Sequence, residues 1–125
     1  MSTTRYTRDH EWLRLETDGS VTLGITAYAQ EQLGDIVYVE LPDTGSRIDP
    51  ARNVVVIESV KAVGEVKLPV GGTVLAANAA LADRPELVNS APEGEGWLLR
   101  VELDDAAMLE GLYDADAYAA YVATL

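Results

Sequence analysis

One lysine of this chain stands where its amine could carry chemistry. Two of the nine lysine and arginine residues are lysines, and Lys61 lies in a short turn between the strand-like runs 54–58 and 65–68. A lysine amine attacks an activated acyl group only as the free base, so a hairpin tip that a second enzyme can reach suits acylation. Glu58 and Glu65 flank the turn and offer charges for recognition by such an enzyme. On these residues alone, Lys61 is either a modification site or an ordinary solvent-exposed lysine.

Other kinds of catalytic or binding site have little support in the residue types. The chain has no cysteine, which excludes a disulfide, a thiolate nucleophile and a cysteine-ligated metal. His10 is the only histidine and no serine stands in a nucleophile-elbow motif, which disfavours a catalytic triad and a histidine-based metal site. The glycines at 71–72 and 94–96 follow no dinucleotide-binding pattern and are explained by turns. We expect His10 to be a structural, partly exposed histidine.

Charge and length narrow the class of protein. The net charge of −12 disfavours nucleic-acid binding, and it suits either docking onto basic protein surfaces or solubility alone. No apolar run approaches the roughly 20 residues of a membrane helix. Residues 1–10 lack the apolar core of a secretory signal, which favours the bacterial cytoplasm, with a trimmed mitochondrial form as the alternative. The 125 residues predict a single domain, 1–125.

The elements that must position Lys61 are mostly short strands. Residues 11–16 and 21–25 flank the turn Asp18-Gly19-Ser20 and predict a hairpin. The nearly continuous branched run 54–58 is typical of a strand buried on both faces, and residues 97–103 alternate with a period of two. Further strands are predicted at 36–41, 65–68 and 73–77. Many short strands with frequent turns predict a mainly β domain, a small barrel or sandwich.

Helices are fewer and shorter. The spacing predicts one over 27–33, with Thr26 as the N-cap and Gly34 as the stop, and short helical pieces over 79–82 and 106–110. A C-terminal helix over 115–123 begins after Asp114. Four apolar or aromatic residues fall on one face of this segment, and we expect them to pack against the core; they are Tyr118, Tyr121, Val122 and Leu125.

Several separate blocks of the chain resemble the H protein family of the glycine cleavage system. The central block is Glu58-Ser59-Val60-Lys61-Ala62. The others follow in family order and spacing over almost the whole chain: 5–7, 10–12, 24–26, 28–30, 33–42, 69–70 with Gly72, 85–89, 94–98 and 112–118. Because so many blocks agree in order, the resemblance is far more specific than one five-residue motif.

The resemblance implies a function for Lys61. In this family the lysine carries lipoate, bound covalently through its amine. The implied fold is a flattened barrel or sandwich of two sheets, as in lipoyl and biotinyl carrier domains, with short helices and a C-terminal helix. The chain would carry the aminomethyl group of glycine from the P protein, a pyridoxal-phosphate decarboxylase, to the tetrahydrofolate-dependent T protein. The L protein, dihydrolipoamide dehydrogenase, would then reoxidise the arm.

Under this resemblance the chain is a monomeric carrier with no catalysis of its own. Glu58 is expected to be recognised by the enzymes that attach lipoate. Glu11 and Glu65 match acidic family positions near a cleft that receives the loaded arm, where they would contact its amine.

Five positions depart from the usual family pattern: Ala51, Val55, Lys67, Leu68 and Glu93. None of them touches the block around Lys61. The nearest alternative function is an H-like protein that relays octanoyl or lipoyl groups to 2-oxo acid dehydrogenases, also through Lys61. An unmodified interaction module is the alternative from another class. A biotin carrier is disfavoured because no methionine flanks the lysine, and a hydrolase has the least support.

Overall fold

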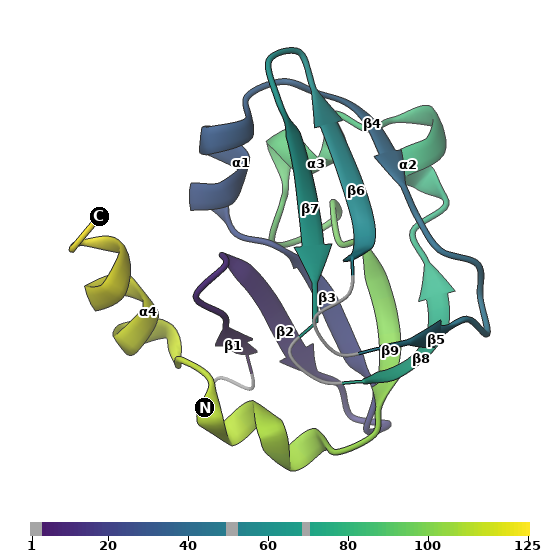
Figure 1. Ribbon diagram of the computed structural model, residues 1–125, viewed down its shortest axis with the longest axis vertical. Coiled ribbons are helices and arrows are strands. Elements are labelled where there is room, and N and C mark those ends of the chain that lie inside the picture. Colours follow the sequence, from purple (N-terminus) through teal and green to yellow (C-terminus); the bar gives the residue numbers. More distant parts are fainter. Residues whose placement is uncertain (1–3, 50–52, 69–70) are drawn as a thin grey trace.

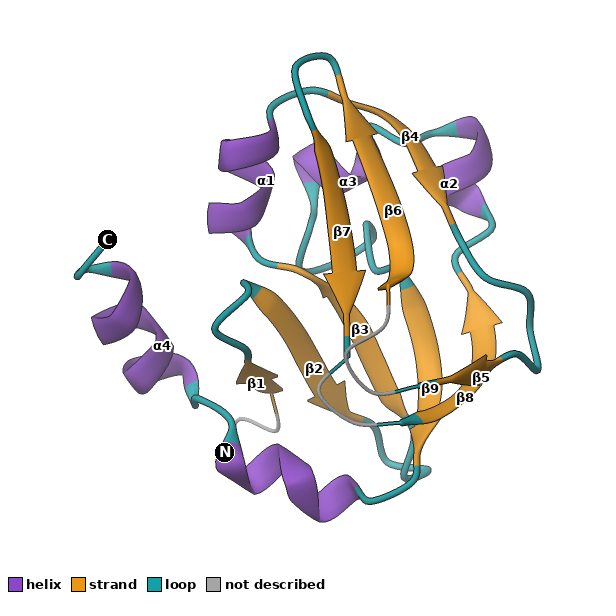
Figure 2. Ribbon diagram, viewed as in Figure 1, coloured by secondary structure: helices purple, strands orange, loops and turns teal. Residues whose placement is uncertain are grey.

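Two antiparallel sheets make up most of the computed structural model, which describes residues 4–49, 53–68 and 71–125 (Figures 1 and 2). The larger sheet has the order β1-β2-β3-β9-β8-β5 and the smaller one β4-β6-β7. The strands of the larger sheet are β1 (Thr4–Tyr6), β2 (Glu11–Leu15), β3 (Val21–Ile25), β9 (Leu99–Leu103), β8 (Gly72–Ala77) and β5 (Arg47–Ile48); those of the smaller are β4 (Ile36–Glu40), β6 (Asn53–Ser59) and β7 (Val63–Lys67). The predicted mainly β, two-sheet architecture is confirmed.

The predicted hairpin of β2 and β3 has a turn whose residues explain it. Ser20 donates to the Asp18 carboxylate through its backbone N–H at 2.9 Å and its hydroxyl at 2.6 Å. Gly19 lies at φ 88°, a conformation that costs glycine little. With the turn fixed, Leu13 pairs with Leu23 across the two strands.

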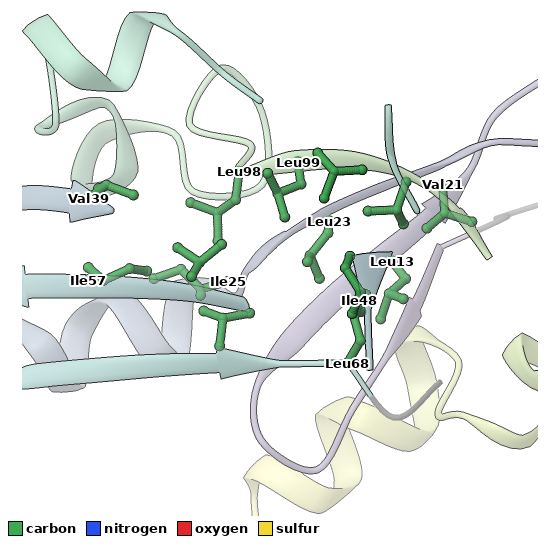
Figure 3. Close-up of a cluster of buried hydrophobic side chains, with 14 of the residues drawn as sticks. Leu13, Val21, Leu23, Ile25, Val39, Ile48, Ile57, Leu68, Leu98 and Leu99 are labelled. Atoms are coloured by element: carbon green, nitrogen blue, oxygen red, sulfur yellow. The ribbon is translucent and has the colours of Figure 1, made fainter. Parts of the chain in front are cut away.

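The core lies between the facing sides of the two sheets. Figure 3 shows side chains from both sheets gathered in one cluster, Ile57 of β6 and Ile25 of β3 among them. Along β6, Val55 and Ile57 are fully buried whereas Val54 and Val56 are half-buried. The prediction that this strand is buried on both faces is therefore wrong. The smaller sheet covers the core with one face and leaves its other face open, so more and less buried side chains alternate along β6 and β7.

The described residues also form five short helical segments. Three lie between strands: α1 (Ala27–Leu33), α2 (Ala80–Asp83) and α3 (Leu87–Ser90); the 3-10 helix η1 (Ala106–Gly111) and α4 (Ala115–Val122) follow the last strand. The predicted caps are confirmed for α1 and α4. The Thr26 hydroxyl accepts from the Ala29 N–H, and the Asp114 carboxylate accepts from the Ala117 N–H. The sequence did not predict α3, and β9 begins at Leu99 rather than at residue 97.

The apolar face of α4 packs only in part. Tyr118 is buried and Tyr121 and Val122 are half-buried, but Leu125 lies beyond the helix and is 60% exposed. The expectation of core packing is therefore wrong for Leu125. Because α4 packs against β1 at the rim of the larger sheet, its last turn extends past the surface that could cover it (Figure 1).

Candidate functional site

Lys61 lies at the tip of the hairpin formed by β6 and β7, at the top of Figure 1. Glu58 and Val63 form the last pair of the ladder, and Ser59 closes the four-residue turn. The Ser59 N–H donates to the Ala62 carbonyl at 2.8 Å, and the Ser59 hydroxyl oxygen accepts from the Ala62 N–H at 2.9 Å. These bonds leave Lys61 exposed at a turn position whose backbone is held in place.

The C-terminal end of α1 packs closely against this tip. The Val60 N–H donates to the Asp35 carbonyl at 3.0 Å. Gly34 lies at φ 82°, and a Cβ atom there would be 3.1 Å from the Cε atom of Lys61. A Cβ atom at Gly64 would come within 3.0 Å of the Leu33 side chain. The two glycines therefore allow the helix end and the hairpin to approach each other.

Asn89 of α3 fixes the segment that joins α1 to β4, a role the sequence did not predict. Its side-chain N–H donates to the Gly34 carbonyl at 2.8 Å, and its side-chain oxygen accepts from the Ile36 N–H at 2.8 Å. The only sequence signal was its place in a block that resembles the family. Since Gly34 lies against the Lys61 side chain, Asn89 supports the hairpin tip indirectly, through its hydrogen bond to Gly34.

A cleft of about 210 Å³ opens beside the hairpin, between α1, β7 and the loop before β2. Its walls are apolar where Ala29 and Leu33 face Ile57. The polar end is acidic, with Asp9, Glu11 and Glu65 among its lining residues. A more open hollow of about 450 Å³ shares these three carboxylates and reaches Arg8, Val63 and Lys67. The structure thus places both predicted cleft carboxylates, Glu11 and Glu65, in the lining of one cleft.

The two carboxylates differ in their environments. Glu65 is exposed on β7, whereas Glu11 is 2% exposed. The Glu11 carboxylate accepts from the Thr7 hydroxyl at 3.0 Å and from the Lys67 N–H at 3.1 Å. Burial raises the pKa of Glu11 from 4.5 to about 7, although both hydrogen bonds act in the opposite direction. Glu11 can therefore exchange a proton near neutral pH.

Glu58 lies outside the cleft, on the open face of the smaller sheet. It pairs with Tyr38 of β4 on one side and with Val63 of β7 on the other, and all three side chains are exposed. Val60, at 74% exposure, adds an apolar side chain beside Lys61. An enzyme that approaches Lys61 would therefore meet apolar side chains and the carboxylate of Glu58.

The residues that depart from the family pattern fit their surroundings in the described part of the chain. Val55 is fully buried opposite Val66, so it contributes to the core. Lys67 is exposed; its backbone N–H donates to the Glu11 carboxylate at 3.1 Å, and its charge also lowers the pKa of Glu11. Glu93 accepts from the Ala27 N–H at 3.0 Å, at the N-terminus of α1 where a negative charge is favourable. Ala51 lies outside the described residues.

The described residues give no support for a metal site or a membrane-spanning helix. The described residues contain no group of three acidic or histidine side chains arranged to hold a metal ion. Among them there is also no helix with the length and apolar character needed to cross a membrane. His10 is half-buried and its Nδ1 lies 2.8 Å from the Tyr118 hydroxyl, as expected of a structural histidine.

Comparison with known proteins agrees with this geometry. The family model of the glycine cleavage H-protein matches residues 4–125. A glycine cleavage system H protein from Chromobacterium violaceum is 55% identical over 115 residues, covering 92% of this chain and 90% of the relative. One from Acidiphilium cryptum is 50% identical over the full length of both chains. The crystal structure of a glycine cleavage system H protein from Mycobacterium marinum superposes with a TM-score of 0.87, at 33% identity and 98% coverage of both chains. The chain belongs to the glycine cleavage H-protein family.

Proposed function

We propose that this chain is a single-domain carrier protein, residues 1–125, of the glycine cleavage system, with lipoate attached to the amine of Lys61. One observation carries the proposal: an exposed amine on a fixed hairpin tip adjoins a cleft with apolar walls and an acidic end. In this proposal the chain itself catalyses no step, since the partner enzymes supply the catalytic groups.

The residues of the cleft suit a lipoyl arm. Ala29, Leu33 and Ile57 offer apolar surface to a hydrocarbon chain that starts from the neighbouring hairpin tip. When bound, the lipoyl group supplies the sulfur that carries the aminomethyl group between enzymes. The protein holds this arm in one place, which reduces the number of orientations that each partner enzyme must select.

Glu11 and Glu65 are proposed to bind the amine at the far end of the arm. The carried amine is a cation at neutral pH, and both carboxylates line the cleft. A cation beside Glu11 favours the ionised carboxylate and so lowers its pKa from about 7. Glu11 would therefore release its proton as the amine arrives, and a charged pair would replace a buried neutral acid.

The partners would be the P protein, the T protein, the L protein and the enzymes that attach lipoate. Exposed Glu58 and the apolar side chains of Val60 and Val63 form the surface that surrounds Lys61. We propose that lipoate-attaching enzymes recognise this surface, with Glu58 meeting a basic group. The bacterial origin of the relatives supports a bacterial protein, which we place in the cytoplasm as a monomer.

Intact-mass measurement on protein purified from its own cells tests the modification. The wild-type chain and the control Lys67→Arg should gain the mass of one lipoyl group, and Lys61→Arg should gain none. A mass equal to that of the unmodified wild-type chain would refute the carrier function. Reconstitution with P and T proteins then separates glycine cleavage from lipoyl relay, because only the former gives glycine-dependent transfer to tetrahydrofolate.

A further inference from the structure

The loop between β1 and β2 has an unusual backbone. The Thr7 N–H donates to the Glu11 carbonyl at 2.9 Å, and the His10 N–H donates to the Thr7 carbonyl at 3.1 Å. Within the described ranges, His10 is the one residue other than glycine with a positive φ, 70°. This conformation is uncommon for a residue with a side chain, and it persists where surrounding contacts hold it.

Those contacts come from α1, whose Tyr28 ring lies 4.4 Å from the His10 ring, and from the C-terminal helix α4. The Tyr118 hydroxyl lies 2.8 Å from Nδ1 of His10, and the Tyr121 hydroxyl donates to the Arg8 carbonyl at 3.2 Å. The Tyr118 ring also stacks on Tyr6 of β1, with 4.7 Å between centroids and an interplanar angle of 10°. Helix α4 therefore contacts both β1, which precedes the loop, and the loop residues Arg8 and His10.

The same hydroxyl also reaches α1. Tyr118 lies 2.8 Å from the Thr26 hydroxyl, which caps α1 by accepting from the Ala29 N–H. One arrangement uses both hydroxyl donors: Thr26 donates to Tyr118, and Tyr118 donates to Nδ1 of His10. Thr26 is 1% exposed and Tyr118 9%, so water competes little for these bonds.

The two segments that Tyr118 joins both line the cleft, and they also contact each other directly: the Thr26 N–H donates to the His10 carbonyl at 2.9 Å, and the His10 ring lies 4.4 Å from the Tyr28 ring. The loop supplies Asp9 and His10, and α1 supplies Ala29 and Leu33. We propose that Tyr118 is a positioning residue for the arm cleft, because its hydroxyl holds the loop wall through His10 and the α1 wall through Thr26. This inference rests on the proposed function. It adds that the C-terminal helix, which does not line the cleft, reinforces the link between two of its lining segments and so contributes to the protection of the arm.

The variant Tyr118→Phe tests the inference because it keeps the ring that stacks on Tyr6 and removes the hydroxyl alone. Tyr113→Phe is the matched control, since the Tyr113 hydroxyl makes no hydrogen bond to the part of the chain that the structure describes. His10→Gly is the second variant, because glycine keeps the positive φ while removing the ring. All three are first compared with wild type as unmodified proteins.

Amide hydrogen exchange gives the first readout. In Tyr118→Phe and His10→Gly we expect the His10 amide, or its glycine counterpart, to exchange about fivefold faster relative to wild type after correction for side-chain identity. In Tyr118→Phe the Ala29 amide should show the same acceleration. The Ala62 amide at the hairpin tip should not change in any variant. Faster exchange of all amides together would mean a general loss of stability and would overturn the inference.

The second readout uses the lipoylated protein after loading with the aminomethyl group. Its loss to water leaves the thiol and releases formaldehyde and ammonium, which can be measured. Tyr118→Phe and His10→Gly should lose the group about fivefold faster, and Tyr113→Phe at the wild-type rate. Wild-type rates in all variants would overturn the inference but leave the proposed function standing. A wild-type chain that accepts no lipoyl group would instead refute the proposed function, while the exchange data would still decide whether Tyr118 joins the two walls.

Discussion

Replacing Glu11 by glutamine should make the protein more stable at neutral pH. The Glu11 side chain is 2% exposed and its pKa rises from 4.5 to about 7 in the folded chain. Glutamine resembles the protonated acid, keeps an oxygen for the Lys67 N–H, and carries no charge that burial could penalise. Since one pKa unit corresponds to about 1.4 kcal/mol, the ionised carboxylate costs about 3 kcal/mol of folding free energy above pH 7.

The pH dependence distinguishes this effect from a general improvement in packing. Below pH 4.5 the carboxyl is protonated in both the folded and the unfolded chain, so wild type and Glu11→Gln should differ little. Between pH 4.5 and about 7 the unfolded chain has released the proton and the folded chain still holds it. The free energy of unfolding of wild type therefore falls relative to the variant by about 1.4 kcal/mol per pH unit, and the difference levels off above pH 7.

Urea denaturation between pH 4 and 8.5, followed by the fluorescence of buried Trp12, measures this difference. Glu40→Gln, at an exposed carboxylate on β4, is the matched control and should change stability by less than about 0.5 kcal/mol at every pH. A wild-type and Glu11→Gln difference that stays constant from pH 4.5 to 8 would refute the reasoning, since it would show that Glu11 gives up its proton as easily when folded as when unfolded.

Three further predictions concern the hairpin tip and its support. Asn89→Ala removes both bonds to the segment between α1 and β4 and should cost about 2 kcal/mol in urea denaturation; a cost below about 0.5 kcal/mol would contradict the supporting role. Gly34→Ala should cost about 2 kcal/mol because of its φ of 82°, whereas Gly111→Ala, with open space around it, should stay within about 0.5 kcal/mol; equal costs would remove the argument from backbone strain. Glu58→Gln should leave stability within about 0.5 kcal/mol and slow enzymatic lipoylation several-fold at low salt, with the difference shrinking as salt rises; an unchanged rate at low salt would refute the recognition role.

The sequence predicted those elements whose signals are local. The hairpin of β2 and β3 follows from the turn residues Asp18 and Gly19, and α1 follows from its cap at Thr26 and its stop at Gly34. By contrast, β1 has three residues and β5 has two, too few for a period-two pattern to appear. These two strands form because each pairs with a neighbouring strand in the folded chain, β1 with β2 and β5 with β8.

Within the candidate site, the sequence predicted Glu11 and Glu65 as cleft residues but not their environments, and it did not predict the role of Asn89. Glutamate is among the residues least often buried, so nothing local marks Glu11 as buried. Its burial depends on Thr7 and on the backbone of Lys67, 56 positions away in the chain. The branched run of β6 likewise indicated burial on both faces, because sequence alone does not reveal that no other sheet of the described residues covers the outer face of the smaller one.

Because Glu11 holds its proton when no cation is present, the cleft can contain three carboxyl groups without the electrostatic repulsion of three negative charges. Asp9, Glu11 and Glu65 line the same cleft, and three ionised carboxylates there would repel one another. Burial together with the charge of Asp9 keeps Glu11 protonated up to about pH 7, which removes one of the three charges. A cation that enters restores that charge by displacing the proton, so the binding free energy includes the cost of ionising Glu11. The cleft should therefore hold an amine more tightly as the pH rises toward 7, and a neutral group of the same shape should show no such dependence.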